Sequence, residues 1–218
     1  MKIIALITAR ANSKRIKKKN IKKLLGQPLV IWTIKPAKKV KGIFDIYVST
    51  DDNNVIKICK KFNVKAPWKR PKKLCNSKSK SEDVVIHFLN WYEKKFTKVD
   101  GLLLLQPTSP FRKKYSIEKA INIFKKNPKK SVVSFSPINN EQSNLFFFNK
   151  NSKNINKKKD ILNLFKLNGS IYISSPKNLR KYKSFLKPQV MPLIQTSKKE
   201  SIDIDTKKDW IQAEKIGK

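Results

Sequence analysis

Residues 3–20 read IIALITARANSKRIKKKN, so that a short apolar run passes directly into a polar and strongly basic segment. The run from Ile3 to Ile7 has the length and composition of a buried strand. A helical pattern follows from about Pro28, a residue that favours the first position of a helix. This part of the chain therefore predicts a strand, a basic loop over residues 9–20 and a helix, in that order.

The same alternation continues along the chain. Further strands are expected at residues 44–49, 101–105, 131–135 and 170–174. Helices are expected where apolar residues recur at three- and four-residue spacing, and a last helix is expected after the cap residue Thr206. The apolar stripes begin at Val55, Val85 and Ile117. Strands that alternate with helices are typical of a parallel sheet with crossover helices, so the sequence predicts an α/β fold.

No linker divides the chain, and we expect a single domain over residues 1–218. The alternation is interrupted after Pro137, and residues 149–159 consist almost wholly of Asn, Lys and Ser. We interpret residues 137–166 as an excursion from the main sheet. Asn168-Gly169 is then expected to form a turn that leads into the next strand.

The net charge is +36, from 51 Lys and Arg against 15 Asp and Glu. Such a charge is typical of nucleic-acid-binding proteins. Here, however, 46 of the basic residues are lysines spread along the chain, and the 19 Asn and 25 Ile are in similar excess, as an AT-rich coding sequence would produce. We interpret most lysines as compositional background and expect neither nucleic acid nor a membrane as a partner.

The scarcity of some residue types excludes other classes of protein. Two cysteines and the single His87 are too few for a disulfide framework or a Cys/His zinc site, and they give no support to a hydrolytic triad. We expect His87 to form an exposed helical pair with Asp83. Apolar runs such as residues 102–105 are far shorter than the roughly 20 residues of a membrane-spanning helix. We therefore expect a cytoplasmic protein.

The basic loop after the first strand is the first candidate binding segment. In an open α/β sheet, functional groups gather beyond the carboxyl ends of the strands. Cationic and hydroxyl side chains with exposed backbone N–H groups at this place are suited to a triphosphate. The side chains are Arg10, Ser13, Lys14, Lys19 and Asn20. A solvated basic loop is the alternative, since neither a P-loop nor a dinucleotide fingerprint is present.

Three other polar segments follow expected strands or precede expected helices. Asp51 and Asp52 follow the second strand and have helix capping as their alternative role. Arg70, Ser79 and Ser81 are polar groups of the kind that can recognise a base edge. The loop over residues 105–112, which contains Gln106, is fixed by two prolines and suited to holding a substrate, with a plain proline-rich turn as the alternative.

Arginine is rare in this chain, so its positions are informative. Arg10, Arg15, Arg70 and Arg112 all fall in expected loops. A guanidinium can hold a phosphate or a carboxylate at two points, which a lysine cannot do. We expect these arginines to bind such groups.

The segment Ser201-Ile202-Asp203-Ile204-Asp205 alternates between apolar and acidic residues. In an extended segment, residues i and i+2 project from the same face, so the two carboxylates would lie side by side. Paired carboxylates are suited to Mg²⁺ held together with substrate phosphates. The alternative is a capping cluster for the last helix, a role that fits Asp209 better than the pair.

Together these segments resemble the CMP-sialic acid synthetases, or acylneuraminate cytidylyltransferases, including relatives that act on pseudaminic and legionaminic acids. The resemblance runs nearly end to end. Its carriers are Ala9-Arg10 with Ser13-Lys14 and Lys19-Asn20, Ser49-Thr50-Asp51-Asp52, Arg70-Pro71, residues 104–110 (LLQPTSP) with Arg112, Asn168-Gly169-Ser170-Ile171-Tyr172-Ile173, and Ser201-Ile202-Asp203-Ile204-Asp205-Thr206.

The resemblance implies a three-layer α/β/α, Rossmann-like nucleotide-diphospho-sugar transferase fold with a mostly parallel sheet. It also implies that CTP is joined to a nine-carbon 2-keto sugar acid with release of pyrophosphate, in a homodimer formed through residues 137–166. The implied CTP-binding residues are Arg10, Ser13, Lys14, Lys19, Asn20, Arg70, Ser79 and Ser81. The implied sugar-binding residues are Gln106, Lys158 and Lys166. Asp203 and Asp205 would hold Mg²⁺, and these two with Lys14 and Lys19 would be catalytic.

The chain departs from the family pattern at several positions. Lys158 and Lys166 stand where the family has arginines that contact the sugar acid, and lysine keeps the charge but not the planar fork. A related cytidylyltransferase for another keto-sugar acid, such as the eight-carbon Kdo, is therefore an alternative. A basic nucleic-acid-binding protein on a decayed enzyme scaffold is an alternative of a different class.

Overall fold

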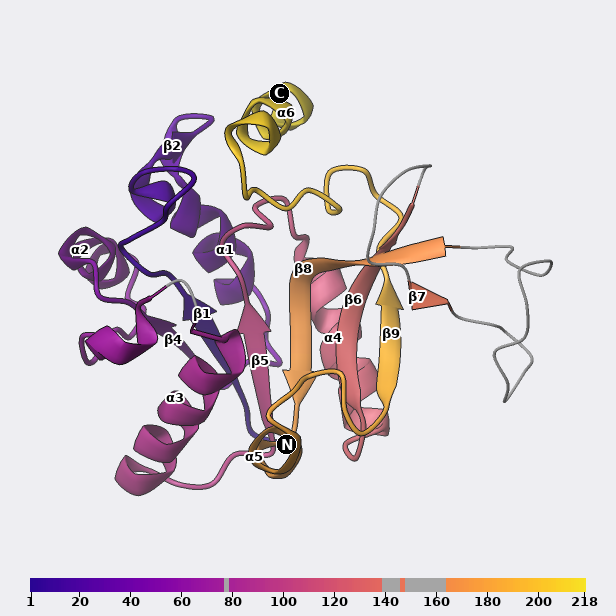
Figure 1. The fold of residues 1–218 in the computed structure, drawn as a ribbon. Helices are drawn as coiled ribbons and strands as arrows, with labels where there is room; N and C mark the ends of the chain where they lie inside the picture. Colours follow the sequence, from indigo (N-terminus) through magenta and orange to yellow (C-terminus); the bar gives the residue numbers. More distant parts are fainter. Residues whose placement is uncertain (77–78, 139–145, 148–163) are drawn as a thin grey trace.

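The structure is a computed structural model that describes residues 1–76, 79–138, 146–147 and 164–218. In this part of the chain, seven strands form a mixed sheet at the centre of the molecule (Figure 1). Six of them lie in the order β4 (Asp45–Ser49), β1 (Ile3–Thr8), β5 (Gly101–Leu105), β8 (Leu164–Ser174), β6 (Ser131–Pro137) and β9 (Val190–Ile194). The seventh, β7 (Phe146–Phe147), pairs with β8.

The sheet is parallel except around β8. Strand β1 is parallel to both β4 and β5, and β6 is parallel to β9. Strand β8 runs antiparallel between β5 and β6. The expected mostly parallel sheet is confirmed, and β8 adds an antiparallel strand at its centre.

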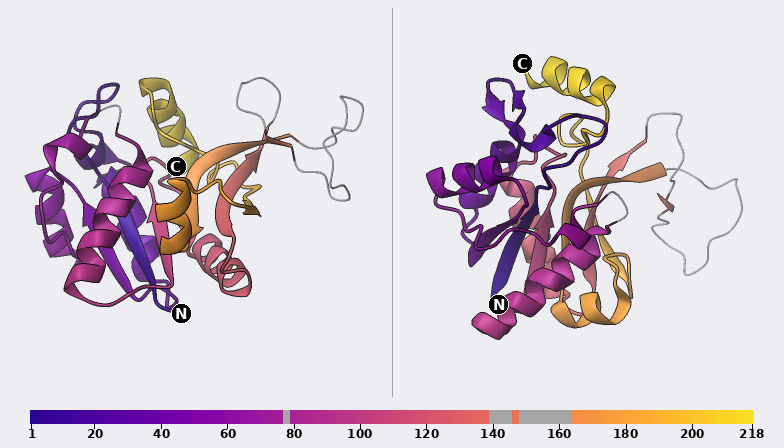
Figure 2. Two further views of the ribbon diagram at one scale, coloured as in Figure 1. Left: turned by 60° about the horizontal axis from the view of Figure 1, so that its bottom comes forward. Right: turned by 60° about the vertical axis from the view of Figure 1, so that its left-hand side comes forward.

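Helices cover both faces of the sheet (Figures 1 and 2). The first face carries α1 (Leu29–Lys38), α2 (Asn53–Lys61) and α4 (Lys114–Lys126), and the second carries α3 (Ser81–Lys95) and α5 (Pro176–Tyr182). Leu103 and Leu105 of β5 pack into the first layer, while Leu102 and Leu104 pack into the second. A fully buried Leu contributes about 1.5–3 kcal/mol, so this short apolar strand helps to hold the three expected layers together.

A small third cluster lies at the carboxyl edge of the sheet. It joins α6 (Lys207–Gly217) to a hairpin of β2 (Lys23–Leu24) and β3 (Gln27–Pro28), which sequence reasoning did not predict. The two residues between these strands, Leu25 and Gly26, both have positive φ, as a tight hairpin turn requires. Figure 1 shows α6 above the carboxyl ends of β1 and β5. In the described part of the chain, two short 3-10 helices complete the fold, η1 (Lys19–Ile21) and η2 (Lys72–Leu74).

The expected turn at Asn168-Gly169 is wrong. Both residues lie inside the single strand β8, where the register with β6 shifts between Val133 and Phe135. Gly169 has φ +70°, a conformation open to glycine but strained for most residues. The Asn-Gly pair therefore forms an irregularity within a strand, because β6 pairs with β8 both before it, at Leu167, and after it, at Tyr172.

Most of the expected excursion lies outside the described residues. Of residues 137–166, the structure describes Pro137, Ile138, the β7 residues and the start of β8. Figure 2 shows the first half of β8 extending beyond the helical layers. The homodimer expected from this region stays a prediction, as does the single domain. No helix in the described part of the chain has both the length and the apolar character needed to cross a membrane.

Helix α6 begins with a capping box that also fixes the preceding segment. The Thr206 hydroxyl accepts from Asp209 N, and Asp209 Oδ2 accepts from the backbone N of Thr206 and of Asp205. These hydrogen bonds hold the pKa of Asp209 below its ordinary value, although burial acts in the opposite direction. The expected capping roles of Thr206 and Asp209 are confirmed.

Thr206→Ala is expected to lower the free energy of unfolding by about 1 kcal/mol, because the first turn of α6 loses its side-chain acceptor. Urea denaturation of the full chain measures this difference. Lys208→Ala, an exposed substitution on the same helix, is the control and should stay within about 0.5 kcal/mol of wild type. Equal losses in the two variants would contradict the capping role.

Candidate functional site

A polar cavity lies at the carboxyl edge of the sheet, where the segments after β1 and β5 meet the start of α3 and the segment before α6. Its lining includes Arg10, Ser13, Lys19, Asn20, Arg70, Ser79, Ser81, Gln106, Asp203 and Asp205. All of these were candidates from the sequence, although they come from five separate segments. The tertiary structure therefore brings most of the expected site together.

The basic loop is anchored to its surroundings rather than freely solvated. Ala9 N donates to Ser49 O at 3.0 Å and Ala11 N donates to Asp51 Oδ1 at 2.7 Å, which ties the loop to the end of β4. The buried Asn20 side chain donates to Arg10 O at 2.9 Å and closes the loop on itself. A fixed backbone holds cationic side chains in place over the cavity, as a phosphate site requires.

The neighbouring acids Asp51 and Asp52 have different roles. Asp52 caps α2 by accepting from Asn54 N at 2.8 Å. Asp51 accepts a hydrogen bond from the backbone N of Ala11 in the basic loop. It therefore helps to hold this loop in place, although it does not line the cavity. The capping alternative is right for Asp52 only.

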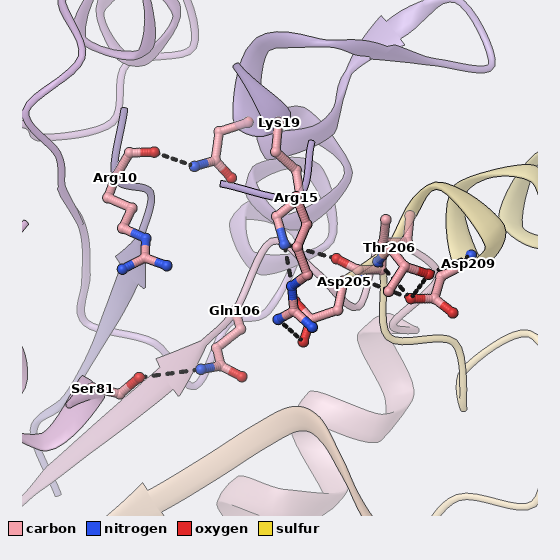
Figure 3. Close-up of polar contacts among 10 residues, drawn as sticks. Arg10, Arg15, Lys19, Ser81, Gln106, Asp205, Thr206 and Asp209 are labelled. Atoms are coloured by element: carbon pink, nitrogen blue, oxygen red, sulfur yellow. Dashed lines mark hydrogen bonds and ion pairs between the residues drawn. The ribbon is translucent and has the colours of Figure 1, made fainter. Parts of the chain in front are cut away.

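Lys19 is a largely enclosed cation of the basic loop. Its side chain is 11% exposed, and Nζ donates to Ile204 O at 2.7 Å and to Asp205 Oδ1 at 3.2 Å. Arg15 reaches the other oxygen of the same carboxylate, with Nη2 2.9 Å from Asp205 Oδ2. Figure 3 shows both cationic side chains converging on Asp205. Lys14, in contrast, is exposed and does not belong to the cavity lining.

The acidic pair lies as its sequence alternation predicted. Ile202 and Ile204 are buried against α6, and Asp203 and Asp205 both line the cavity, although the segment is not part of any strand. Asp203 is open to solvent through the cavity and surrounded by protein elsewhere. That burial, aided by the charges of Asp205 and Asp209, raises the pKa of Asp203, while a hydrogen bond with Thr108 and the charge of Lys19 act against the rise.

Gln106 lies at the carboxyl end of β5, where it faces Asp203 across Gly169. Its Nε2 donates to Ser81 Oγ at 3.2 Å, as Figure 3 shows. A Cβ placed on Gly169 would lie 3.1 Å from Gln106 Oε1 and 3.4 Å from Asp203 Oδ2. The missing side chain at position 169 therefore lets β8 pass close to both groups.

Two of the four loop arginines make several hydrogen bonds within the protein. Arg112 is buried and donates to Ser170 O at 2.8 Å and Gln106 O at 2.7 Å. Arg70 is also buried and donates to the backbone O and side-chain Oγ of Ser49, while one side of it lines the cavity. Burial lowers the pKa of both guanidinium groups. Their planar forks fix backbone carbonyls, which sequence alone could not distinguish from ligands.

Lys166 and His87 do not belong to the cavity lining. Lys166 lies exposed in β8, opposite Ser136 of β6, and Lys158 lies outside the described residues. His87 is half-buried against Trp68, with 6.1 Å between ring centroids, so the expected exposed pair with Asp83 is wrong. Burial and the charges of Lys73 and Arg70 lower the pKa of His87.

The cavity also contains side chains that sequence reasoning did not assign. They are Thr8, Leu74, Lys80, Val84, Pro107 and Thr108. Thr8 and Thr108 lie at or just after the carboxyl ends of β1 and β5, so the strand-end rule could have found them. Lys80 precedes α3 in a lysine-rich stretch and carried no signal of its own.

Comparison with known proteins identifies the family of the chain. A family model described as cytidylyltransferase matches residues 4–216. The CMP-N,N'-diacetyllegionaminic acid synthase of Legionella pneumophila is 38% identical over 235 aligned residues, which cover 99% of this chain and 96% of the relative. The N-acylneuraminate cytidylyltransferase of Streptococcus agalactiae is 31% identical over 97% of this chain, which spans 52% of that relative's length.

The fold is shared with a solved structure of CMP:2-keto-3-deoxy-manno-octonic acid synthetase complexed with CTP. The TM-score is 0.74 at 17% sequence identity, over 100% of this chain and 98% of the other. The family model extends from β1 to α6 and so includes every segment that lines the cavity. This chain belongs to the cytidylyltransferase family.

Proposed function

We propose that this chain transfers the cytidylyl group of CTP to a nine-carbon 2-keto sugar acid and releases pyrophosphate. The observation that carries the proposal is the cavity, in which a fixed basic loop faces two carboxylates across the carboxyl edge of the sheet. The name of the Legionella relative, a CMP-N,N'-diacetyllegionaminic acid synthase, supports the class of acceptor. We also propose that the protein acts in nucleotide-sugar biosynthesis in the cytoplasm, on a route to cell-surface polysaccharide.

We assign the two ends of CTP to different parts of the cavity lining. Arg70, Ser79 and Ser81 lie at the side formed by η2 and α3, and we assign them to the cytosine and ribose. We assign the phosphates to the basic loop, where the contacting residues would be Arg10, Ser13, Lys19 and Asn20. Lys14 lies outside the lining, and we assign it no direct contact. Gln106 is assigned to the sugar acid, with Lys158 and Lys166 as further candidates.

The residues present fit a magnesium ion only in part. Asp203 and Asp205 offer hard oxygen ligands in the cavity, but the described residues contain no group of three or more His, Cys, Asp or Glu that could hold a metal by itself. Mg²⁺ takes about six oxygens and is usually bound by one or two carboxylates together with substrate phosphates. The donor set therefore fits Mg²⁺ that is shared with the triphosphate, where the ion would neutralise charge on the leaving pyrophosphate.

The chain contributes mainly position and charge to the reaction. The anomeric hydroxyl of the sugar acid attacks the α-phosphorus in line and loses its proton to solvent or to a phosphate oxygen, and the bond to pyrophosphate breaks as negative charge moves to the leaving group. Lys19 is held by Ile204 O and Asp205, so its charge is already in place beside the phosphates. Gln106, supported by Ser81 and by Arg112, orients the acceptor. Fixed groups of this kind act without reorganisation during the reaction.

The first test is a substrate panel. Pyrophosphate release from CTP and Mg²⁺ is measured with sialic, pseudaminic, legionaminic and Kdo acids, and release with a nine-carbon acid is expected. Release with Kdo alone would show that the acceptor is an eight-carbon acid and not a nine-carbon acid. An absence of release with every acid would reject the enzyme, and RNA binding that falls steeply with salt would then favour the nucleic-acid-binding alternative.

Asp203→Asn is expected to lower kcat about 10²- to 10³-fold, because a neutral amide cannot hold the cation that offsets charge in the transition state. Steady-state pyrophosphate release measures kcat, and circular dichroism verifies the fold. Asp100→Asn removes the same charge at the opposite, amino end of β5 and should leave kcat within about twofold of wild type. A comparable loss in both variants would argue against a local role.

Gly169→Ala and Gly26→Ala form a matched pair. Both glycines have positive φ, so each substitution costs about 1–2 kcal/mol of backbone strain. A new Cβ meets nothing within 4 Å at Gly26, but at Gly169 it meets Gln106 and Asp203. Gly169→Ala should therefore lower kcat/KM about tenfold and Gly26→Ala should not. Similar activities in two equally destabilised variants would show that the close approach of β8 is unimportant.

A further inference from the structure

Both carboxylate oxygens of Asp205 are bound by cationic side chains. Lys19 Nζ lies 3.2 Å from Oδ1 and Arg15 Nη2 lies 2.9 Å from Oδ2. Figure 3 shows the two cations approaching the carboxylate together. A metal ion that uses Asp205 must therefore share or displace one of them.

The two cations differ in how firmly they are held. The Lys19 side chain is 11% exposed and has a second bond to Ile204 O. The Arg15 side chain is 62% exposed, and within the described part of the chain its one ion pair is with Asp205, itself 43% exposed. Exposed pairs of this kind are weak, because water and salt screen the charges. Arg15 is therefore the partner that can leave.

The charges around Asp205 explain under which conditions Arg15 would leave this carboxylate. Asp203 and Asp205 carry two negative charges at most, and Lys19 and Arg15 carry two positive charges. A divalent cation thus gains little from the carboxylates while Arg15 remains on Asp205. A triphosphate adds negative charge and oxygen ligands, and it offers the guanidinium a better partner, since the planar fork of arginine suits phosphate.

We propose that Arg15 is a positioning residue that competes with the divalent cation for Oδ2 of Asp205, so that the cation enters the site together with the nucleotide. The inference rests on the proposed function, which supplies the triphosphate. It assigns a role to an arginine that does not belong to the cavity lining. Lys19 stays on Oδ1 throughout and keeps the carboxylate oriented.

The test measures Mn²⁺ binding to the full chain by electron paramagnetic resonance at low ionic strength, in the absence of nucleotide. Arg15→Ala is expected to bind Mn²⁺ about threefold more tightly than wild type or better, because the ion no longer has to displace a guanidinium. Lys17→Ala, an exposed change of equal charge in the same loop, should alter the affinity less than about twofold. Damage to the fold would weaken the site, so a gain in affinity cannot arise from it.

Two further arms make the result specific. The gain from Arg15→Ala should disappear in an Asp205→Asn background, and Arg15→Ala should no longer bind Mn²⁺ more tightly than wild type when CTP is present without sugar acid. Unchanged or weaker Mn²⁺ binding by Arg15→Ala without nucleotide would overturn the proposal. So would an equal gain in Lys17→Ala, or a gain that survives Asp205→Asn.

Pyrophosphate release is measured separately on the same proteins. A tighter Mn²⁺ site in Arg15→Ala, with no release by wild type on any sugar acid, would reject the proposed function and leave the competition standing. Normal release with no change in Mn²⁺ affinity would reject the competition alone.

Discussion

The buried guanidinium of Arg112 is the interaction on which the site depends. It donates to Gln106 O at the end of β5 and to Ser170 O in β8, and so joins the parallel part of the sheet to its central antiparallel strand. Burial lowers its pKa while Glu200 and Asp203 favour its charge. The two carbonyls belong to Gln106 and to the residue after Gly169, so Arg112 joins the two strands beside the close approach at Gly169.

A network of buried polar groups continues from this point towards the C-terminal segment. The Asn168 amide donates to Ser136 Oγ and Gln195 Oε1, and Gln195 in turn donates to Glu200 Oε1. Glu200 also accepts from the backbone N of Lys113 at the start of α4. Each of these side chains except Lys113 is buried, where an unpaired polar group would be costly. The network therefore fixes the chain on the N-terminal side of Asp203, and the α6 capping box fixes it on the C-terminal side.

The charge of +36 has little part in this architecture. The cations that matter are few and are placed by specific bonds: Lys19 by Ile204 O, Arg10 by Asn76 O, and Arg15 by Asp205. The alternation of strands and helices, the capping residues and the inward-facing acids could all be predicted from local patterns, because each depends on spacing within one segment. The hairpin at Leu25 and Gly26 could not, since Leu-Gly is not one of the residue pairs that mark a tight hairpin turn. The antiparallel direction of β8 could not either, since it depends on contacts between distant segments.

The sequence by itself determined the α/β class, most of the element positions and the residue types of the site, because burial periodicity and strand-end chemistry are local properties. Only the tertiary structure decided which polar residues serve the cavity and which serve the fold. Arg112 is buried against backbone carbonyls, whereas Arg70 is bound to Ser49 and still lines the cavity. Lys14 lies outside the cavity, and Arg15 binds Asp205. The physical reason is that the partner of a charged side chain is chosen by packing across the sheet, and no spacing along the chain records it.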